Sequence, residues 1–370
     1  MFDFLIVGAG FSGSVFAERI ASQLNQRVLI VDQRDHIGGN AFDYYNEAGI
    51  LIHKYGPHWF HTNDKGVFSY LSAFTDWHYH YHRVKSYVDG TLVPIPINLD
   101  TLKLLYGLNL QSPAEVQAYY DQVKIPVKTP TNSEEVVTSQ VGEDLYNKLF
   151  KGYTLKQWGI PPKELAASVA GRIPVRTNRD DRYFTDSYQG MPKHGYTAMF
   201  KKMLSHPNIS IMLQTDYRTI INEISHKKLI YTGPIDSFFD YKYGKLPYRS
   251  LRFEHETLNQ EQYQSHQQIN YPNDYDFTRV VEWKHATQQK SQVTTITREY
   301  PMPAEGGMEK YYPIPKEDNH LLFRKYQEEA DKLDHVVFCG RLADYKYYNM
   351  DQVVARSLKI FEDQIQVKPR

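Results

Sequence analysis

The chain has 370 residues, and its 43 basic and 43 acidic side chains balance to a net charge near zero. This balance argues against nucleic acid or an anionic membrane as a general partner, although a local basic site for an anionic substrate stays possible. The length is sufficient for two or three domains. The one cysteine, Cys339, excludes an internal disulfide framework and fits a reducing, cytoplasmic compartment.

No stretch approaches the roughly 20 apolar residues that a membrane helix needs. Glycines interrupt the apolar N-terminal run, and no basic segment precedes it, so we expect a strand there instead of a signal peptide. Cys339 lies in the apolar run VVFCG, which favours a buried strand residue over a nucleophile.

Residues 2–32 predict a strand–helix–strand unit that binds a dinucleotide. Gly8, Gly10 and Gly13 form G-x-G-x-x-G between an apolar run and an amphipathic segment. These glycines permit a tight turn, a close approach of the backbone to a pyrophosphate, and close packing of the helix on the strand. Phe11 and Ser12 stand at the helix start, where free N–H groups face the diphosphate. Asp32 follows nineteen residues after Gly13, in position to bind a ribose hydroxyl.

A second glycine pair, Gly38-Gly39, follows the predicted ribose-binding acid and precedes Asn40. Glycine pairs are common in ordinary loops. Next to an intact strand–helix–strand unit, however, the pair favours an extended ligand such as FAD over a nicotinamide dinucleotide. The arrangement resembles the glutathione-reductase-like FAD proteins of the amine-oxidase branch.

The next segments alternate between irregular and strand-like patterns. Residues 56–64 (GPHWFHTND) predict an irregular loop near the cofactor that carries His58 and His61. Residues 77–97 alternate in polarity and contain Asp89-Gly90, a two-residue hairpin signal.

From residue 99 to 170 the spacing of apolar residues becomes helical. Ser112 and Pro113 predict one helix start, and Ser133 followed by Glu135 predicts another. Residues 161–162, both proline, then end the helical pattern and begin a loop.

The remainder predicts a return to the first domain, interrupted by an antiparallel sheet. A helix and a strand are expected within 195–214, and antiparallel strands within 229–316. A buried strand, a glycine turn and a helix opening near Met350 complete the chain. We therefore expect an α/β fold with a discontinuous Rossmann-like domain, an inserted helical domain and an antiparallel sheet domain. The expected FAD-binding domain comprises 1–56, 187–228 and 335–370; the helical domain comprises 99–171, with a mobile loop at about 159–172; the sheet domain comprises 57–98, 172–186 and 229–334.

Most common catalytic motifs are missing from the sequence. It contains no G-x-S-x-G elbow, no H-E-x-x-H and no paired-cysteine zinc pattern. His78, His80 and His82 alternate along one expected strand, but they lack the further ligands of a metal site, so we expect no metal. The 30 tyrosines suit sites for sugars and nucleobases, although tyrosine-rich strands account for most of them.

Five segments together resemble the bacterial UDP-galactopyranose mutases: FKGYTLKQWG (150–159), GPHWFHTN (56–63), TRVVEWKH (278–285), YYPIP (311–315) and FCGRLADYKYYNMD (338–351). The resemblance runs from Phe2 to the final helix. It implies a cytoplasmic homodimeric isomerase that binds FAD and interconverts UDP-galactopyranose and UDP-galactofuranose for cell-surface glycan assembly.

The resemblance also implies a reaction without net redox change. Reduced FAD attacks the anomeric carbon through N5 and displaces UDP; a flavin–sugar iminium then lets the sugar ring open and reclose. The departing diphosphate has to be held as an anion, for which two guanidinium groups are suited. By resemblance these belong to Arg172 and Arg279, and His61 lies beside the flavin.

Further residues take roles only through this resemblance. Tyr153 matches the tyrosine that stacks on uracil, and the loop from Trp158 to Arg172 would close over substrate. The other substrate residues implied are Phe150, Thr154, Tyr183, Phe184, Tyr312, Tyr347 and Asn349. The cofactor residues expected outside the first glycine motif are Asp32, Gly38, Gly39, Asn40, His58, His61, Gly340, Arg341, Tyr347 and Met350.

One position departs from the family pattern, and the environment of one residue pair also differs from it. Asn349 stands where an aspartate is expected, so a charge-based role at this position is in doubt, and His82-Arg83 replaces an asparagine-containing version. Two other functions stay open at this stage. An FAD-dependent amine oxidase would share the opening unit, and a nucleotide-sugar-binding protein would hold FAD without catalysis. The sequence leaves open the preference between galactose and its N-acetylated analogue.

Overall fold

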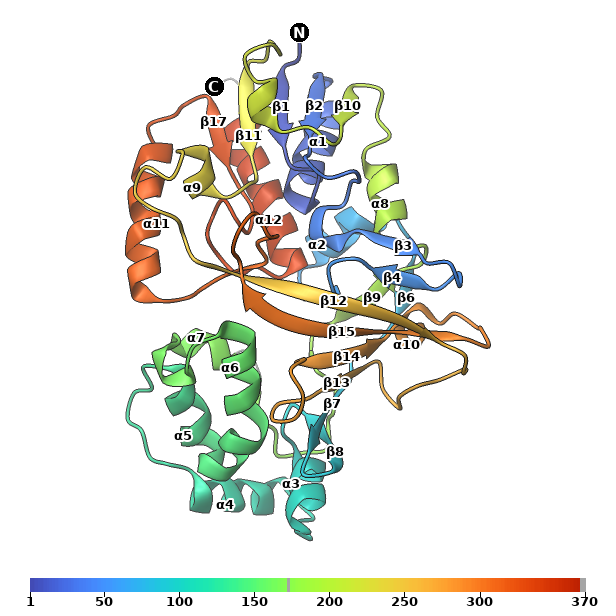
Figure 1. Ribbon diagram of the computed structural model, residues 1–370, viewed down its shortest axis with the longest axis vertical. Coiled ribbons are helices and arrows are strands. Elements are labelled where there is room, and N and C mark those ends of the chain that lie inside the picture. The colour runs from blue at the N-terminus through green and yellow to red at the C-terminus, as the bar shows by residue number, and fades with distance from the viewer. Residues whose placement is uncertain (172–173, 367–370) are drawn as a thin grey trace.

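The first and last strands of the chain belong to one parallel sheet in the computed structural model, which describes residues 1–171 and 174–366 (Figure 1). The opening strand carries the glycine-rich turn at its carboxyl end. In spatial order the sheet consists of β10 (Ile209–Met212), β2 (Val28–Val31), β1 (Phe4–Val7), β11 (Lys228–Tyr231) and β17 (Val336–Phe338).

Both faces of this sheet are covered, as its near-continuous apolar strands predict. Ile6 and its neighbours on one face pack against α1 (Phe11–Leu24), α2 (Lys65–Ser72), α8 (Tyr196–Met203) and α12 (Met350–Ile360). Leu5 on the opposite face packs with Tyr231 and residues near α9 (Ile235–Phe238). The predicted strand–helix–strand opening, the helix and strand within 195–214, and the closing strand and helix are confirmed.

A long antiparallel sheet crosses the middle of the molecule, below the parallel sheet in Figure 1. Its order is β16 (Tyr312–Pro313), β12 (Tyr248–Leu258), β15 (Thr294–Pro303), β14 (Arg279–Glu282), β13 (Gln268–Asn270), β7 (Val84–Val88) and β8 (Thr91–Ile95). All neighbours are antiparallel except β13 and β7, which run parallel. The expected boundary at residue 228 falls inside β11, because this strand pairs with β1 and continues the parallel sheet to Tyr231.

The hairpin predicted at Asp89-Gly90 joins β7 to β8, with positive φ angles of 50° and 80° at the two turn residues. A second hairpin pairs β3 (Asp43–Tyr45) with β4 (Leu51–His53). The segment 56–64 is less irregular than expected. Within it, β5 (Phe60–Thr62) pairs with β9 (Tyr188–Pro192), which also pairs with β6 (Trp77–Tyr79).

The helical part lies beside the far end of the antiparallel sheet (Figure 1). It contains α3 (Leu99–Tyr106), α4 (Pro113–Val123), α5 (Ser133–Tyr146), a π-helical turn η2 (Asn147–Lys151), α6 (Gly152–Trp158), a 3₁₀ turn η3 (Pro162–Glu164) and α7 (Ala167–Ala170).

Of the two helix starts predicted in this part, the one at Ser112 is confirmed, and the other lies one residue earlier than predicted. Ser112 caps α4 as expected, since its Oγ accepts the Glu115 N–H at 3.3 Å. The cap of α5 is Asn132 and not Ser133. The Asn132 side chain accepts the Glu135 N–H at 3.0 Å, whereas the Ser133 hydroxyl donates to the carbonyl of Ala166.

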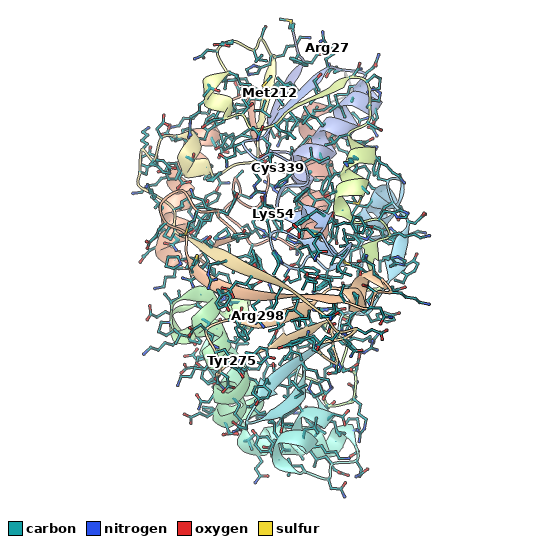
Figure 2. The ribbon with its side chains drawn as sticks, turned by 45° about the vertical axis from the view of Figure 1, so that its right-hand side comes forward. Arg27, Lys54, Met212, Tyr275, Arg298 and Cys339 are labelled. Atoms are coloured by element: carbon teal, nitrogen blue, oxygen red, sulfur yellow. The ribbon has the colours of Figure 1, made fainter. Side chains whose placement is uncertain are left out.

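Helix α11 (Glu317–Ala330) was not predicted from the sequence. Its buried side chains, Tyr326 and Ala330, pack in a cluster with Tyr345. The remaining short helical segments are η1 (Gly39–Ala41), η4 (Tyr217–Thr219), α10 (Lys284–Thr287) and η5 (Phe361–Ile365). Cys339 is fully buried among elements of the parallel sheet, away from Tyr275 and Arg298 in the antiparallel-sheet part (Figure 2). In the described ranges, no helix has the length and apolar character to span a bilayer.

Candidate active site

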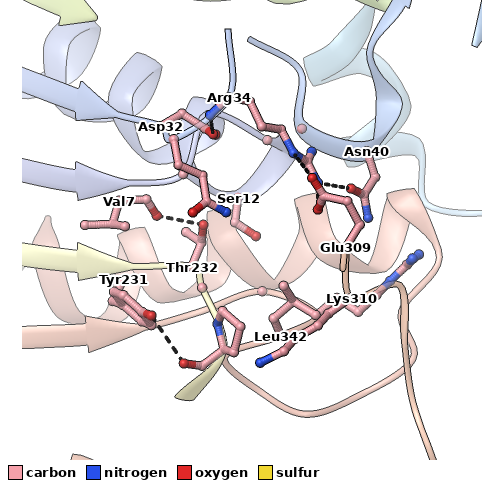
Figure 3. Close-up of a pocket in the computed structure, with 18 of the residues that line it drawn as sticks. Val7, Ser12, Asp32, Arg34, Asn40, Tyr231, Thr232, Glu309, Lys310 and Leu342 are labelled. Atoms are coloured by element: carbon pink, nitrogen blue, oxygen red, sulfur yellow. Dashed lines mark hydrogen bonds and ion pairs between the residues drawn. The ribbon is translucent and has the colours of Figure 1, made fainter. Parts of the chain in front are cut away.

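A cavity of about 450 Å³ opens beyond the carboxyl ends of β1, β2 and β11 (Figure 3). This is where ligands bind in open α/β sheets. Among the expected cofactor residues, three do not line it: Gly13, His61 and Tyr347. The expected cofactor residues that line the cavity are Gly8, Gly10, Phe11, Ser12, Asp32, Gly38, Gly39, Asn40, His58, Gly340, Arg341 and Met350.

The two glycine segments contact each other at the edge of this cavity. The Gly38 N–H donates to the carbonyl of Ala9 at 2.8 Å. Gly13 serves helix packing, because an added Cβ would lie 1.9 Å from the Gly8 oxygen. Gly10 differs: a Cβ there would meet no protein atom closer than 3.6 Å. The fold therefore tolerates a side chain at Gly10, whereas a pyrophosphate at the helix start would not.

The start of α1 presents donors to the cavity. No side chain caps this helix, whose N-cap residue is Gly10. Asp32 is 9% exposed and fixes the turn, since its carboxylate accepts the N–H groups of Ala9 at 2.8 Å and Arg34 at 2.9 Å. The uncapped N–H groups of the helix and the glycine turn match the diphosphate of a dinucleotide, and the carboxylate matches its ribose.

Several cavity residues carried no signal in the sequence. Thr232 donates its hydroxyl to the carbonyl of Val7 at 2.8 Å and so joins β11 to β1 at the cavity floor. Arg34 and Glu309 both line the cavity and contact each other in an ion pair (Figure 3). They lie in different parts of the chain, so neither local pattern nor spacing could have found them.

Arg279, at the start of β14, is the central cation of a second group of residues. Its Nη2 donates to the buried carboxylate of Glu299 on β15 at 2.6 Å. Its Nε is buried without a hydrogen-bond partner among the described residues. Burial acts to lower the pKa of Arg279, but the Glu299 carboxylate outweighs it and the pKa stays well above the ordinary value. The guanidinium is thus permanently charged and keeps an unused donor.

Aromatic side chains from three parts of the chain gather near this cation, whose charge acts on Tyr312. The rings of Tyr312 and Tyr347 meet edge to face at 5.0 Å, and Trp158 lies 6.2 Å from each. Arg341 extends from the cofactor cavity toward them, with its guanidinium 5.7 Å from the Tyr312 ring and 5.3 Å from the Tyr347 ring. The cofactor cavity and the aromatic group are therefore connected.

Tyr153 on α6 belongs to the same group. Burial raises its pKa, and the charges of Arg279 and Glu299 are close enough to act on it. The tyrosine hydroxyl is accordingly neutral and can donate a hydrogen bond.

His61 lies in a stacked arrangement beside this group. Its ring is parallel to the ring of Phe184 at 3.5 Å, and its Nδ1 contacts the Asp186 carboxylate at 2.8 Å. A carboxylate partner fixes the orientation and tautomer of a histidine. Tyr183 meets Phe184 edge to face at 5.0 Å. Asp186 was not identified from the sequence.

His58 lines the cofactor cavity and is held by its own loop. Its ring Nδ1 contacts the Gly56 carbonyl at 2.8 Å. Burial lowers the pKa of His58 to about 4, and the nearby Arg341 and Arg279 act in the same direction. His58 is therefore neutral at physiological pH.

The other expected substrate residues lie in the helical part or at the start of α12. Phe150 is buried in the core of the helical part. Thr154 lies partly exposed on α6. Asn349 is the N-cap residue of α12, and its backbone N–H donates to Gln352 Oε1 at 2.9 Å. Asparagine and aspartate both suit an N-cap, so this departure from the family pattern preserves the helix start. Arg172 lies outside the described residues.

His82 is buried and connects to His80 through Gln267, whose amide contacts a ring nitrogen of each histidine. Within the described ranges, no three histidine, cysteine, aspartate or glutamate side chains gather closely enough to hold a metal ion.

Comparisons with known proteins agree with this geometry. Residues 148–347 match the family model for UDP-galactopyranose mutase, and residues 6–74 match an NAD(P)-binding Rossmann-like domain. A probable UDP-galactopyranose mutase from Klebsiella pneumoniae is 38% identical, over 98% of this chain and 94% of the relative. A dTDP-fucopyranose mutase from Escherichia coli is 35% identical, with 96% of both chains covered.

A crystal structure of reduced UDP-galactopyranose mutase has the same fold, with a TM-score of 0.79 over 100% of this chain and 97% of that one, at 17% identity. The relatives of high identity and coverage, together with the family model, show that the chain belongs to the UDP-galactopyranose mutase family. Members of this family are mutases, so the protein is an isomerase.

Proposed function

We propose that the protein is a UDP-galactopyranose mutase that uses reduced FAD to interconvert UDP-galactopyranose and UDP-galactofuranose. The observation that carries this proposal is Arg279. Its charged guanidinium has an unused buried donor and lies near tyrosines that meet edge to face and adjoin the dinucleotide cavity. A cation beside aromatic rings suits a nucleoside diphosphate.

The residues of the cavity fit FAD. The uncapped start of α1 and the space at Gly10 suit the diphosphate, and Asp32 suits the adenosine ribose. At the other end of the cavity, Arg341 and the start of α12 at Met350 suit the flavin. When bound and reduced, the flavin supplies a nucleophilic nitrogen for the anomeric carbon.

The side chains of this chain then act on the nucleotide sugar. Arg279 and Arg172 bind the diphosphate and stabilise the charge that UDP carries as it leaves. Tyr153 stacks on uracil, and Tyr312 and Tyr347 donate hydrogen bonds to the phosphates. His61, whose Nδ1 contacts the Asp186 carboxylate, lies beside the flavin, and Phe184 lies near the uridine and ribose. The other proposed substrate residues are Phe150, Thr154, Trp158, Tyr183 and Asn349.

A mutase assay tests this proposal. The purified protein, loaded with FAD and reduced with dithionite, should convert UDP-galactofuranose to UDP-galactopyranose, and chromatography should resolve the two. The oxidised protein should be inactive. Because one relative is named as a dTDP-fucopyranose mutase, dTDP-fucose in its two ring forms is tested in parallel, together with the N-acetylated UDP-sugar.

The same experiment separates the two other functions. An amine oxidase would consume oxygen and form no ring isomer. A non-catalytic nucleotide-sugar-binding protein would hold reduced FAD and UDP yet leave the sugar unchanged. Either result would refute the mutase proposal.

We propose further that the enzyme works as a homodimer in the cytoplasm. Cys339 is free and buried, which is compatible with a reducing compartment. Sedimentation equilibrium should give twice the chain mass of 43.3 kDa, and a monomer at every concentration would contradict the proposal.

A further inference from the structure

One wall of the cofactor cavity comes from a short segment that belongs to neither sheet. Residues 305–310 connect β15 to β16, and Gly307, Met308, Glu309 and Lys310 line the cavity. We call this segment the strap. The Met308 N–H donates to the Glu305 carbonyl at 3.0 Å, so the strap begins with a turn.

The strap is held to β12 on both sides, by the backbone of the residue before it and of the residue after it. Beyond Lys310, the Tyr311 N–H donates to the carbonyl of Arg249 at 3.0 Å, which fixes that end to β12. The Lys310 ammonium lies 5.0 Å from the Tyr248 ring. At the other end, Gly306 and Gly307 have φ angles of 55° and 87°, and a Cβ on either would meet no atom within 4 Å. Ahead of this glycine pair, the Ala304 N–H donates to the carbonyl of Tyr248 at 3.2 Å. The strap is thus anchored to β12 at both ends and contains a loosely packed glycine pair.

A fork-to-fork ion pair joins the strap to the parallel-sheet side of the cavity (Figure 3). Arg34, which follows β2, donates from Nε and Nη2 to the two carboxylate oxygens of Glu309 at 3.1 and 2.5 Å. Arg34 also donates to Asn40 Oδ1 at 2.8 Å, and its guanidinium lies 4.4 Å from the ring of Tyr55. The arginine is therefore held rigidly, and Glu309 is the movable partner.

Both partners line the same cavity as Asp32 and the glycine turn. A dinucleotide with its ribose at Asp32 and its diphosphate at the start of α1 would lie beneath the strap. Leaving the cavity on this side requires the strap to move and the ion pair to separate.

We propose that the strap retains the bound dinucleotide and that the Arg34–Glu309 ion pair sets the rate at which the cofactor leaves. This inference rests on the FAD binding proposed above, but not on mutase activity. The two side chains are 15% and 38% exposed, so the ion pair is partly solvated and contributes about 1 kcal/mol to holding the strap in place. The Arg34–Glu309 ion pair would separate without unfolding of the strap, because Gly306 and Gly307 can take up the change in backbone angles.

The structure also defines an opposing model. Glu309 neutralises a guanidinium that could otherwise bind a cofactor phosphate directly. If Glu309 competed with the phosphate, then removing its charge would slow the release of the cofactor. The two models therefore predict opposite effects of one substitution.

The test compares Glu309→Gln with the wild-type protein and with Glu305→Gln, which removes an exposed carboxylate from the same strap. The oxidised, FAD-loaded proteins are diluted, and the flavin retained after gel filtration is measured over time. Glu309→Gln should release FAD about fivefold faster, the equivalent of about 1 kcal/mol. Glu305→Gln should match the wild type. High salt should speed release from the wild type and have little effect on Glu309→Gln.

A second measurement reports on the strap itself. Amide hydrogen exchange in the peptide that spans residues 305–309 should be faster in Glu309→Gln than in Glu305→Gln or the wild type. Unchanged or slower FAD release from Glu309→Gln would overturn the strap proposal while leaving FAD binding intact. A wild-type protein that takes up no FAD would refute the proposed function as well.

Discussion

Gly10 and Gly13 belong to one motif, but the structure gives them different reasons to be glycine. At Gly13 the protein backbone itself excludes a side chain. At Gly10 the protein leaves room for one, with φ at −79°, which every residue type can adopt. If FAD binds as proposed, the requirement for glycine at position 10 comes from the ligand, and a single substitution separates folding from binding.

Gly10→Ala should therefore fold normally and bind FAD poorly. We expect the free energy of unfolding of the apoprotein to change by less than about 0.5 kcal/mol. The methyl group would occupy space beside the diphosphate, so the dissociation constant for FAD should rise at least about tenfold. Urea unfolding and fluorescence titration measure the two quantities, and Gly13→Ala, which should fail in both, is the comparison.

At the proposed substrate site, Arg279 and Glu299 should respond differently to conservative changes. Arg279→Lys keeps a cation but loses the planar fork, and kcat/KM should fall roughly 100-fold or more. Glu299→Gln leaves a buried cation without its anionic partner, which should cost about 3 kcal/mol of stability in addition to activity. Mutase kinetics and urea unfolding of both variants check this. Equal stability losses for the two variants would argue against the different roles.

The residues of the two sites differ in how well the sequence alone could predict them. Gly8, Gly13 and Asp32 lie within one short strand–helix–strand unit, and local spacing alone predicted them. Arg279 required the resemblance to a known family, because nothing near it in the sequence shows that it is buried. Its partner Glu299 and the Arg34–Glu309 pair depend on contacts between distant segments, which no local pattern contains.

Among the elements, α6 connects the helical part to the antiparallel sheet. It ends at Trp158, followed by Gly159 with a φ angle of 69°. Arg249 on β12 is 6% exposed and donates from Nε to the Gln157 carbonyl and from Nη2 to the Lys156 carbonyl, both at 3.0 Å. A side chain of the sheet thus satisfies carbonyls that the end of a helix leaves unpaired. This contact holds Trp158 against the tyrosines of the proposed substrate site.

Replacing Arg249 by leucine should weaken this junction. Two carbonyls would lose charge-assisted partners, and we expect a loss of about 2–3 kcal/mol in the free energy of unfolding. The KM for the UDP-sugar should rise more than kcat falls, because Trp158 and Tyr153 lie on the loosened helix. Urea unfolding and mutase kinetics test this. A normal KM in a destabilised variant would contradict the link between junction and site.

Elements were predicted best where a local pattern determined them. The apolar runs of β1 and β2 and the Asp89-Gly90 turn are examples. Asn132 displaced Ser133 as the cap of α5 because the Ser133 hydroxyl instead bonds the distant carbonyl of Ala166. Helix α11 was missed since its sequence is mostly polar, and only Tyr326 and Ala330 are buried.

At the scale of the whole molecule, buried neutral histidines make stability depend on pH. The pKa of His58 is lowered to about 4 by burial, against about 6.5 in the unfolded chain. Between these values the unfolded chain binds more protons than the folded one. Stability therefore falls as the pH decreases from about 6.5 to about 4, by about 3 kcal/mol for this residue.

His58→Gln removes that contribution. Urea unfolding of the apoprotein at a series of pH values should show a shallower loss of stability for His58→Gln than for the wild type. Other buried histidines, such as His53 and His82, remain in both proteins, so the difference isolates His58. Identical pH dependence would show that position 58 does not titrate in this way.

The order of strands in the parallel sheet has a consequence for synthesis on the ribosome. Strand β1 emerges first, yet one edge of its sheet is β17, and Gly340, Arg341 and Met350 complete the cavity from the last part of the chain. A nascent chain that lacks these residues has an unfinished pocket and an uncovered apolar sheet face. Flavin loading should thus wait until translation is nearly finished, and ribosome-bound chains stalled before residue 336 should retain no flavin.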